Sequence, residues 1–129
     1  MNFVLDNGIN GYDSLVHARD YVTADFDGNG KEDLFIADHG TDIAPFPGGQ
    51  NRIYFSNNNG KITEASAGNI PQILDFSHHT ASADIDKDGD IDLYVCNIYN
   101  NLQTGPYFLI NNGNGQFSVR NNNIPSTIA

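Results

Sequence analysis

The chain has 129 residues, a length typical of a single domain, and 39% of them are hydrophobic, which predicts a modest core. Its net charge is −10, and its six Lys and Arg residues form no cluster. This composition excludes nucleic acid and anionic membranes as partners, because both require a basic surface on the protein.

The first segment, residues 1–20, begins with a weakly alternating stretch from Met1 to Leu5 and a turn signal at Asp6-Asn7-Gly8. Shifted by 59 residues, it matches the end of the first repeat described below and the link to the second. We therefore expect the last strand of a preceding unit, followed by a linker. This strand could also add to a unit of a neighbouring chain. The segment lacks the features of a signal peptide, so we expect any export signal to lie outside it.

Two stretches of nine residues share one polar pattern. Residues 25–33 read DFDGNGKED, and residues 84–92, which lie 59 positions later, read DIDKDGDID. Both place side-chain oxygens at positions 1, 3, 5 and 9, with a glycine at position 6 that allows a sharp turn. Nine of the 16 acidic residues lie in these stretches. The pattern indicates two copies of one unit.

Oxygen donors at this spacing suit a hard cation. Calcium accepts about six to eight oxygen ligands, whereas zinc prefers Cys or His and magnesium keeps several waters. The bidentate Glu of an EF-hand is missing, because its position holds Ile36 and Val95, so position 9 must complete the ligand shell. Turns rich in Asp, Asn and Gly can also bind nothing. Carboxylates at positions 1, 3 and 9 of both copies favour the cation, because like charges this close repel unless they are neutralised.

Short apolar runs beside these loops predict strands and no helices. We expect strands at residues 21–24, 33–37, 52–56 and 61–64 in the first unit, and at 80–83, 92–97, 107–111 and 116–119 in the second. The connection at residues 39–50 holds Pro45, Pro47 and a Gly48-Gly49 pair, which predicts irregular structure.

Three side chains outside the loops, those of Cys96, His78 and His79, are of types that can be reactive or bind metals. Cys96 lies in an apolar strand run, so we expect a buried, unreactive thiol, and as the only cysteine it allows no intrachain disulfide. His78 and His79 precede the predicted strand at 80–83 and correspond to Arg19 and Asp20 in the first copy. A structural or solvent-facing role is the favoured interpretation of the pair, and a transition-metal or acid–base role is the alternative.

The two units resemble the FG-GAP/VCBS repeat, the blade unit of integrin-α-like β-propellers. The likeness rests on ADFDGNG at 24–30 with DLFI at 33–36, on ADIDKDGD at 83–90 with DLYV at 92–95, and on RIYFSN at 52–57 and YFLINNG at 107–113. It implies an all-β fold of two four-stranded antiparallel propeller blades plus an extra N-terminal strand. Residues 1–20 would hold that strand and linker, residues 21–71 the first blade and residues 72–129 the second.

The resemblance also implies one calcium ion in each loop, two per chain. The implied ligands are Asp25, Asp27, Asn29, the Lys31 carbonyl and Asp33 in the first loop, and Asp84, Asp86, Asp88, the Asp90 carbonyl and Asp92 in the second. The family often has Asp where this chain has Asn29. We therefore expect the first site to bind calcium more weakly.

The family includes adhesion receptors, lectins and non-catalytic parts of large secreted enzymes. We accordingly predict a calcium-binding module for extracellular recognition or adhesion, with lectin-like carbohydrate binding as one form. The alternative is a non-catalytic propeller fragment of a larger exported enzyme or adhesin. Phe46 and Tyr99, in the long connections, are candidates for contact with a sugar or a protein ligand. No nucleophile, metal-hydrolase, P-loop or dinucleotide motif occurs, so we expect no enzyme activity.

Two blades do not close a propeller, which typically has about four to eight. We therefore expect either a homo-oligomer that closes a ring or the remaining blades of a larger chain.

Overall fold

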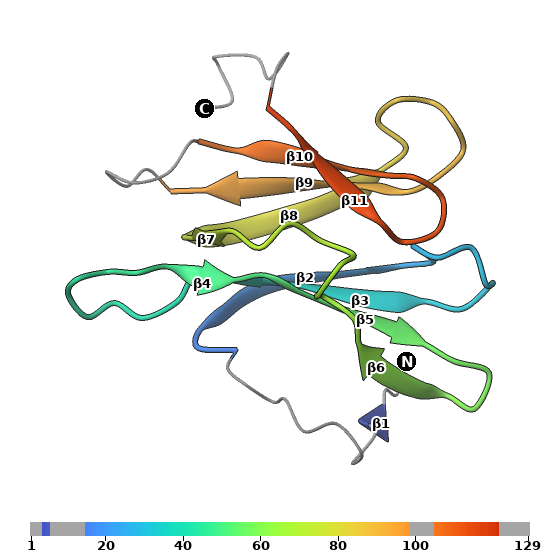
Figure 1. Cartoon of the computed structure of the whole chain (residues 1–129), viewed down its shortest axis with the longest axis horizontal. Helices are drawn as coiled ribbons and strands as arrows, with labels where there is room; N and C mark the ends of the chain where they lie inside the picture. The colour runs from blue at the N-terminus through green and yellow to red at the C-terminus, as the bar shows by residue number, and fades with distance from the viewer. Residues whose placement is uncertain (1–3, 6–14, 99–104, 122–129) are drawn as a thin grey trace.

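The computed structural model describes residues 4–5, 15–98 and 105–121, and within these residues every regular element is a β-strand (Figure 1). The first large sheet has the order β1-β6-β5-β3-β2 and the second has the order β11-β10-β9-β8. The strands of the first sheet are β1 (Val4–Leu5), β2 (Ala18–Ala24), β3 (Asp33–Asp38), β5 (Arg52–Ser56) and β6 (Lys61–Glu64). Those of the second are β8 (Ser77–Ala83), β9 (Asp92–Asn97), β10 (Tyr107–Asn111) and β11 (Phe117–Arg120).

The predicted fold class is confirmed. Strands β2-β3-β5-β6 and β8-β9-β10-β11 form two antiparallel four-stranded sheets that do not close, as expected of propeller blades, and β1 is the extra N-terminal strand. The two blades repeat in register, since Leu34 pairs with Tyr54 as Leu93 pairs with Leu109. Among the eight predicted strands, the main difference from the expected bounds is at the first strand of each blade, because β2 and β8 each begin three residues earlier than expected. No helix long and apolar enough to cross a membrane occurs among the described residues.

Strand β1 has a different partner from the one we expected. Val4 and Leu5 pair in parallel with Lys61 and Ile62 of β6, at the outer edge of the first blade of the same chain. The outermost strand of a blade has unpaired backbone N–H and C=O groups on its free side, and β1 satisfies some of them. The boundaries at residues 20 and 71 remain predictions.

The connection after β3 contains regular structure that we did not predict. Strand β4 (Gly49–Gln50) pairs antiparallel with β7 (Leu74–Asp75) in a separate two-stranded sheet. A Cβ atom on Gly48 would lie 2.7 Å from the backbone oxygen of Asp75, so the two segments approach too closely for any other residue there. The glycine pair therefore permits this pairing, whereas its sequence pattern indicated only a loop.

The core lies between the two blades, and each blade contributes one face to it. The first blade contributes its front face, which we define by Phe35 and Ile53, and both side chains are fully buried. The second contributes its back face, which we define by Leu93 and Leu109. The complete cluster is Phe26, Phe35, Ile53, Ile70, Leu93, Val95, Tyr107, Leu109 and Phe117. The blades therefore pack front to back, with β2 beside β8 at one edge.

The opposite face of each blade has no partner among the residues that the structure describes. On the front face of the second blade, Tyr94 and Phe108 are half-buried and contact each other as tilted rings, with centroids 5.4 Å apart and an interplanar angle of 51°. Cys96 lies on the same strand and is half-buried, which corrects our expectation of a buried thiol. Its counterpart Ala37 is fully buried because it faces the second blade. The difference arises because no third blade covers this face.

Candidate metal centres

The first nine-residue loop connects β2 to β3, and the buried carboxylate of Asp33 holds it in place. The Oδ2 atom of Asp33 accepts a hydrogen bond from the N–H of Phe26 at 2.8 Å, and its Oδ1 atom accepts one from the N–H of Ser56 at 2.8 Å. Ser56 ends β5, so Asp33 ties the loop to the neighbouring hairpin. One carboxylate oxygen each of Asp25, Asp27 and Asp33 lies within 4.8 Å of the others.

Backbone N–H groups wrap around the remaining side chains of this loop. Asp25 accepts hydrogen bonds from the N–H groups of Gly28, Asn29 and Gly30 at 2.9, 3.1 and 2.8 Å. The Oδ1 atom of Asn29 accepts one from the N–H of Lys31 at 2.8 Å. The loop is therefore folded around its own side-chain oxygens, as the pattern at positions 1, 3 and 5 predicts.

The second loop connects β8 to β9 in the same way. One oxygen each of Asp84, Asp86 and Asp88 lies within 4.8 Å of the others, and the Oδ1 atom of Asp88 accepts a hydrogen bond from the N–H of Asp90 at 2.9 Å. Asp92 is fully buried and accepts backbone N–H groups from the start of the loop and from the end of β10, at 2.7 and 2.8 Å. Asp92 therefore anchors this loop as Asp33 anchors the first, but it lies outside the cluster of three.

The carboxylates are electrostatically unfavourable without a cation. Burial raises the pKa of Asp27 and Asp33, and a neighbouring loop carboxylate raises the pKa of each further. Desolvation and the other loop carboxylates likewise raise the pKa of Asp86 and Asp90. Each raised pKa shows that the ionised form is penalised, and a bound cation would remove that penalty.

The donor set of both loops fits calcium. All of the gathered side chains offer oxygen atoms, and neither loop contains a His or Cys. The structure thus brings together three of the predicted side-chain ligands in each loop, whereas Asp92 lies outside its cluster. Asp25, Asp27 and Asp33 of the first loop, and Asp84, Asp86 and Asp88 of the second, are the residues that would hold the ion.

The comparison with protein families identifies the repeat to which both loops belong. A model of the FG-GAP-like repeat matches residues 25–95, which is more than half of the chain and includes both loops. The chain belongs to the FG-GAP-like repeat family. No curated protein and no solved structure matches it. FG-GAP-like repeats are generally non-catalytic structural modules.

In these two FG-GAP-like repeats, the hairpin between β10 and β11 lies between the two nine-residue loops, at the same end of the blades (Figure 1). The side-chain amide of Asn111 donates to the carbonyl of Phe26 in the first loop at 2.8 Å and to that of Ile91 in the second at 3.0 Å. A Cβ atom on Gly113 would lie 2.6 Å from the carboxylate of Asp90. The hairpin therefore couples the two loops across the blade interface.

Sequence reasoning missed the residues that support each loop from the third strand of its blade. Ser56 and Asn111 occupy equivalent positions at the ends of β5 and β10, and each donates its backbone N–H to the position-nine carboxylate. Their equivalence under the repeat was visible, but contact between segments about 20 residues apart depends on the folded sheet. In the sequence, Asn111 belongs to an Asn- and Gly-rich turn, and that pattern does not predict contacts with the loops.

A buried polar network lies at the other end of the FG-GAP-like blades. Asp75 is fully buried, its Oδ2 atom accepts the hydroxyl of Tyr107 at 2.6 Å, and its Oδ1 atom accepts the hydroxyl of Ser77 at 2.7 Å. The amide of Asn51 donates to the Tyr107 oxygen at 3.2 Å, which connects the network to the first blade. Burial raises the pKa of Asp75, while the hydrogen bonds from Tyr107 and Ser77 oppose the increase.

We expect Asp75→Asn to change how stability depends on pH. Because the pKa of Asp75 is raised, the folded protein binds this proton more tightly than the unfolded chain does. The stability that protonated Asp75 contributes is therefore fully present below the ordinary pKa of 3.8 and is lost as the pH rises through the raised pKa. The loss amounts to about 1.4 kcal/mol per unit of pKa shift. Urea unfolding should show Asp75→Asn to be more destabilising near pH 4 than at pH 7. A destabilisation by Asp75→Asn that does not depend on pH would contradict this prediction.

The remaining predicted residues are less informative. Phe46 is 49% exposed, so a ligand can reach its side chain. Its backbone φ is positive, at 56°. Tyr99 lies outside the described residues. His78 and His79 lie in β8, and the pKa of His78 is lowered by burial and by the nearby His39 and Arg19.

Proposed function

We propose that this chain is a calcium-stabilised pair of propeller blades that completes a ring with further blades and presents its loops for extracellular recognition. The observation that carries the proposal is the repeated carboxylate cluster, anchored by Asp33 in one blade and by Asp92 in the other. Calcium would neutralise side chains that otherwise repel, so its role is structural. Extracellular calcium is millimolar, which is sufficient for weak modular sites.

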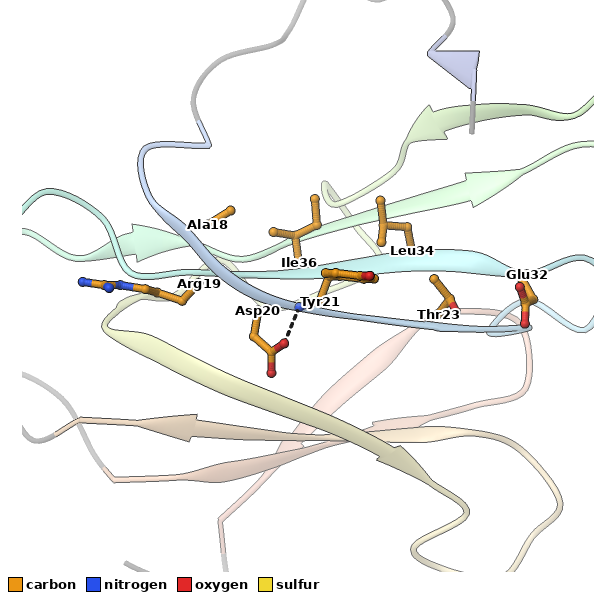
Figure 2. A pocket seen from close by; sticks show the side chains of 8 residues that line it. All are labelled: Ala18, Arg19, Asp20, Tyr21, Thr23, Glu32, Leu34 and Ile36. Carbon is orange, nitrogen blue, oxygen red and sulfur yellow. Dashed lines mark hydrogen bonds between the residues drawn. The ribbon is translucent and has the colours of Figure 1, made fainter. Parts of the chain in front are cut away.

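The open faces support completion by further blades. The back face of the first blade carries Leu34 and Ile36, which Figure 2 shows on the side of β3 away from the second sheet, and the nearby Tyr21 is 68% exposed. These residues, with Ala18, Arg19, Asp20, Thr23 and Glu32, line an open hollow of about 600 Å³. The back face of the second blade, by contrast, is covered within the chain, because it packs on the front face of the first blade.

The two exposed faces therefore match the two that already pack together. Leu34 is the counterpart of the buried Leu93, and Tyr94 is the counterpart of the buried Phe35. A second copy could place its back face on the front face of this one and repeat the internal contact. This contact is head to tail, so it closes a ring when the rotation fits. Three or four copies would supply six or eight blades, within the range of about four to eight in closed propellers.

The molar mass in solution tests the assembly. We expect light scattering in millimolar calcium to give a discrete trimer or tetramer, and chelation to dissociate or destabilise it. A monomer or a polydisperse aggregate in calcium would instead support the alternative, a non-catalytic fragment of a larger exported enzyme or adhesin whose other blades cover these faces.

Recognition itself is assigned to the loops on the ring faces, with Phe46 and Tyr99 as the candidate contacts. A ring would repeat each contact in every chain, so a carbohydrate ligand would bind with high avidity. A glycan array probed with the assembled ring tests the lectin-like form. An empty array would favour a protein ligand, which pull-down with Phe46→Ala as the control would address.

The two calcium sites should differ in affinity. Of the four ligand positions 1, 3, 5 and 9, the first loop has a carboxylate at three and the second loop at all four. The difference is at position 5, where the first loop has Asn29 and the second has Asp88. Affinity in such loops increases with the number of charged ligands, so we expect the first site to be about threefold to tenfold weaker. Calorimetric titration of Asp86→Asn reports the first site, and titration of Asp27→Asn reports the second. Equal affinities, or a tighter first site, would contradict the expectation.

A further inference from the structure

All four histidines of the chain lie close together, at the end of the blades opposite the calcium loops. His17 precedes β2, His39 follows β3, and His78 and His79 lie in β8. The ring centroids are 5.6 Å apart for His17 and His39, and 4.7 Å apart for His39 and His78. These side chains come from three segments that are distant in sequence, so the fold brings them together.

Asp42 adds a carboxylate to this cluster. Its Oδ1 atom lies 3.4 Å from the Nδ1 atom of His39, and its Oδ2 atom lies 3.7 Å from the Nδ1 atom of His17. One ligand atom from each of the three residues lies within 4.8 Å of the others. Tetrahedral zinc binds nitrogen at about 2.0–2.1 Å, which places neighbouring ligand atoms about 3.4 Å apart. The two distances from Asp42 to the histidine nitrogens, 3.4 and 3.7 Å, are close to this value.

The backbone around the cluster is fixed before any ligand binds. The fully buried carboxylate of Asp38 accepts hydrogen bonds from the N–H groups of Val16, His17 and Gly40, at 2.7, 2.9 and 2.8 Å. The N–H of His39 donates to the carbonyl of His17 at 3.0 Å. Asp38 therefore holds the two histidine-bearing segments side by side, as a preformed site requires.

We propose that His17, His39 and Asp42 form a binding site for a borderline transition-metal ion such as Zn²⁺, distinct from the two calcium loops. Two imidazole nitrogens and one carboxylate oxygen are the donor set that zinc prefers and calcium does not. His39 is 4% exposed at its side chain, whereas His17 and Asp42 are 42% and 60% exposed, so an ion can enter from the solvent side.

The imidazole of His78 lies beside this site and also points to a bound ion. The Nε2 atom of His78 is buried and has no hydrogen-bond partner among the described residues, and its ring packs against that of His39. Buried polar atoms are rarely left unpaired without a reason, and a nearby ion or its bound water is one such reason. The second blade has Phe76 and Ile98 where the first has His17 and His39, so the site occurs once per chain.

Two contacts compete with the metal. The Nδ1 atom of His39 lies 3.3 Å from the carbonyl of Gly40, and the guanidinium of Arg19 lies 3.7 Å from the Oδ2 atom of Asp42. If the cluster is only a set of ion pairs, a protonated His39 bridges Gly40 and Asp42, and no metal is needed. If it is a metal site, the charge of Arg19 weakens binding. The metal interpretation therefore predicts that removing Arg19 tightens zinc binding, whereas the ion-pair interpretation predicts no zinc binding with or without Arg19.

Zinc titration by calorimetry, with calcium in excess to occupy the acidic loops, tests the proposal. We expect one Zn²⁺ per chain, and a loss of about tenfold or more in affinity for His17→Ala and for Asp42→Asn, since even the residues that only support a ligand contribute about that much. Both side chains are exposed, so these variants should unfold at the wild-type temperature without zinc. Arg19→Gln should bind zinc more tightly.

His79→Ala is the matched control, because the His79 side chain is 78% exposed and its ion pair is with Asp20, which is not one of the three proposed ligands. Its zinc affinity should equal that of the wild type. The proposal is overturned if no zinc binds at roughly 0.1 mM, if His17→Ala and Asp42→Asn bind as the wild type does, if His79→Ala is equally impaired, or if Arg19→Gln weakens binding. The first of these results, no zinc binding, would identify the cluster as ion pairs alone.

Discussion

Replacing Asp33 with alanine is expected to lower the free energy of unfolding by about 3 kcal/mol or more. The substitution removes a fully buried carboxylate and leaves the buried N–H groups of Phe26 and Ser56 without an acceptor. Each unsatisfied donor costs about 1–3 kcal/mol. Calcium stabilisation of the first loop would be lost in addition, because ligand binding to the native state adds stability by mass action.

Urea unfolding in calcium and in chelator separates the two contributions. In chelator only the hydrogen bonds are lost, so the effect of Asp33→Ala should be smaller there than in calcium. Asp33→Asn keeps an acceptor oxygen and should fall between the wild type and the alanine variant. Glu32→Ala is the control, since it removes a neighbouring exposed carboxylate and should change stability little. An equal effect with and without calcium would show that Asp33 is only a structural anchor.

Phe26→Ala is expected to cost about 3–5 kcal/mol, the usual range for emptying a buried phenylalanine site. Phe26 is position 2 of the first nine-residue loop, yet its side chain is 1% exposed and meets Phe117 of the second blade edge-on at 5.7 Å. It therefore connects a candidate calcium site to the interface between the blades. Thermal and urea unfolding of the variant measure this cost.

Ile85→Ala is the matched test of ring assembly. Ile85 occupies the same loop position in the second blade but is only half-buried, because no third blade covers it in a single chain. In a monomer we expect Ile85→Ala to have little effect. In an assembled ring Ile85 would be buried as Phe26 is, and the substitution should dissociate or destabilise the oligomer. An oligomer unaffected by Ile85→Ala would contradict front-to-back assembly.

The strands were largely predictable because apolar residues alternate along them and the pattern occurs twice. The residues that β2 and β8 gain over the expectation are mostly polar, as at Arg19 and His78, so no alternation marks them. The β4–β7 pair depends on the close approach of Gly48 to Asp75, which only the folded chain shows. The pairing of β1 with β6 likewise involves a contact that the repeat did not predict.

The loops were predictable from spacing alone, since positions 1, 3, 5 and 9 lie within nine residues. Their supports were not, because Ser56 and Asn111 reach the loops across the sheet. The histidine cluster shows the same limit. His78 and His79 are neighbours in sequence, and this made them the predicted candidates. In the folded chain, the residues close enough to bind one metal ion are His17, His39 and Asp42.

The central claim is that each blade holds a calcium ion, and equilibrium calcium binding tests it most directly. Titration of the chelator-treated protein, followed by calorimetry and thermal unfolding, should show two calcium ions per chain and a calcium-dependent rise in unfolding temperature. The double variant Asp27→Asn, Asp86→Asn should lose both effects while remaining folded. If the wild type binds no calcium at the millimolar concentrations found outside cells, the repeated acidic loops are ordinary turns and the account is wrong.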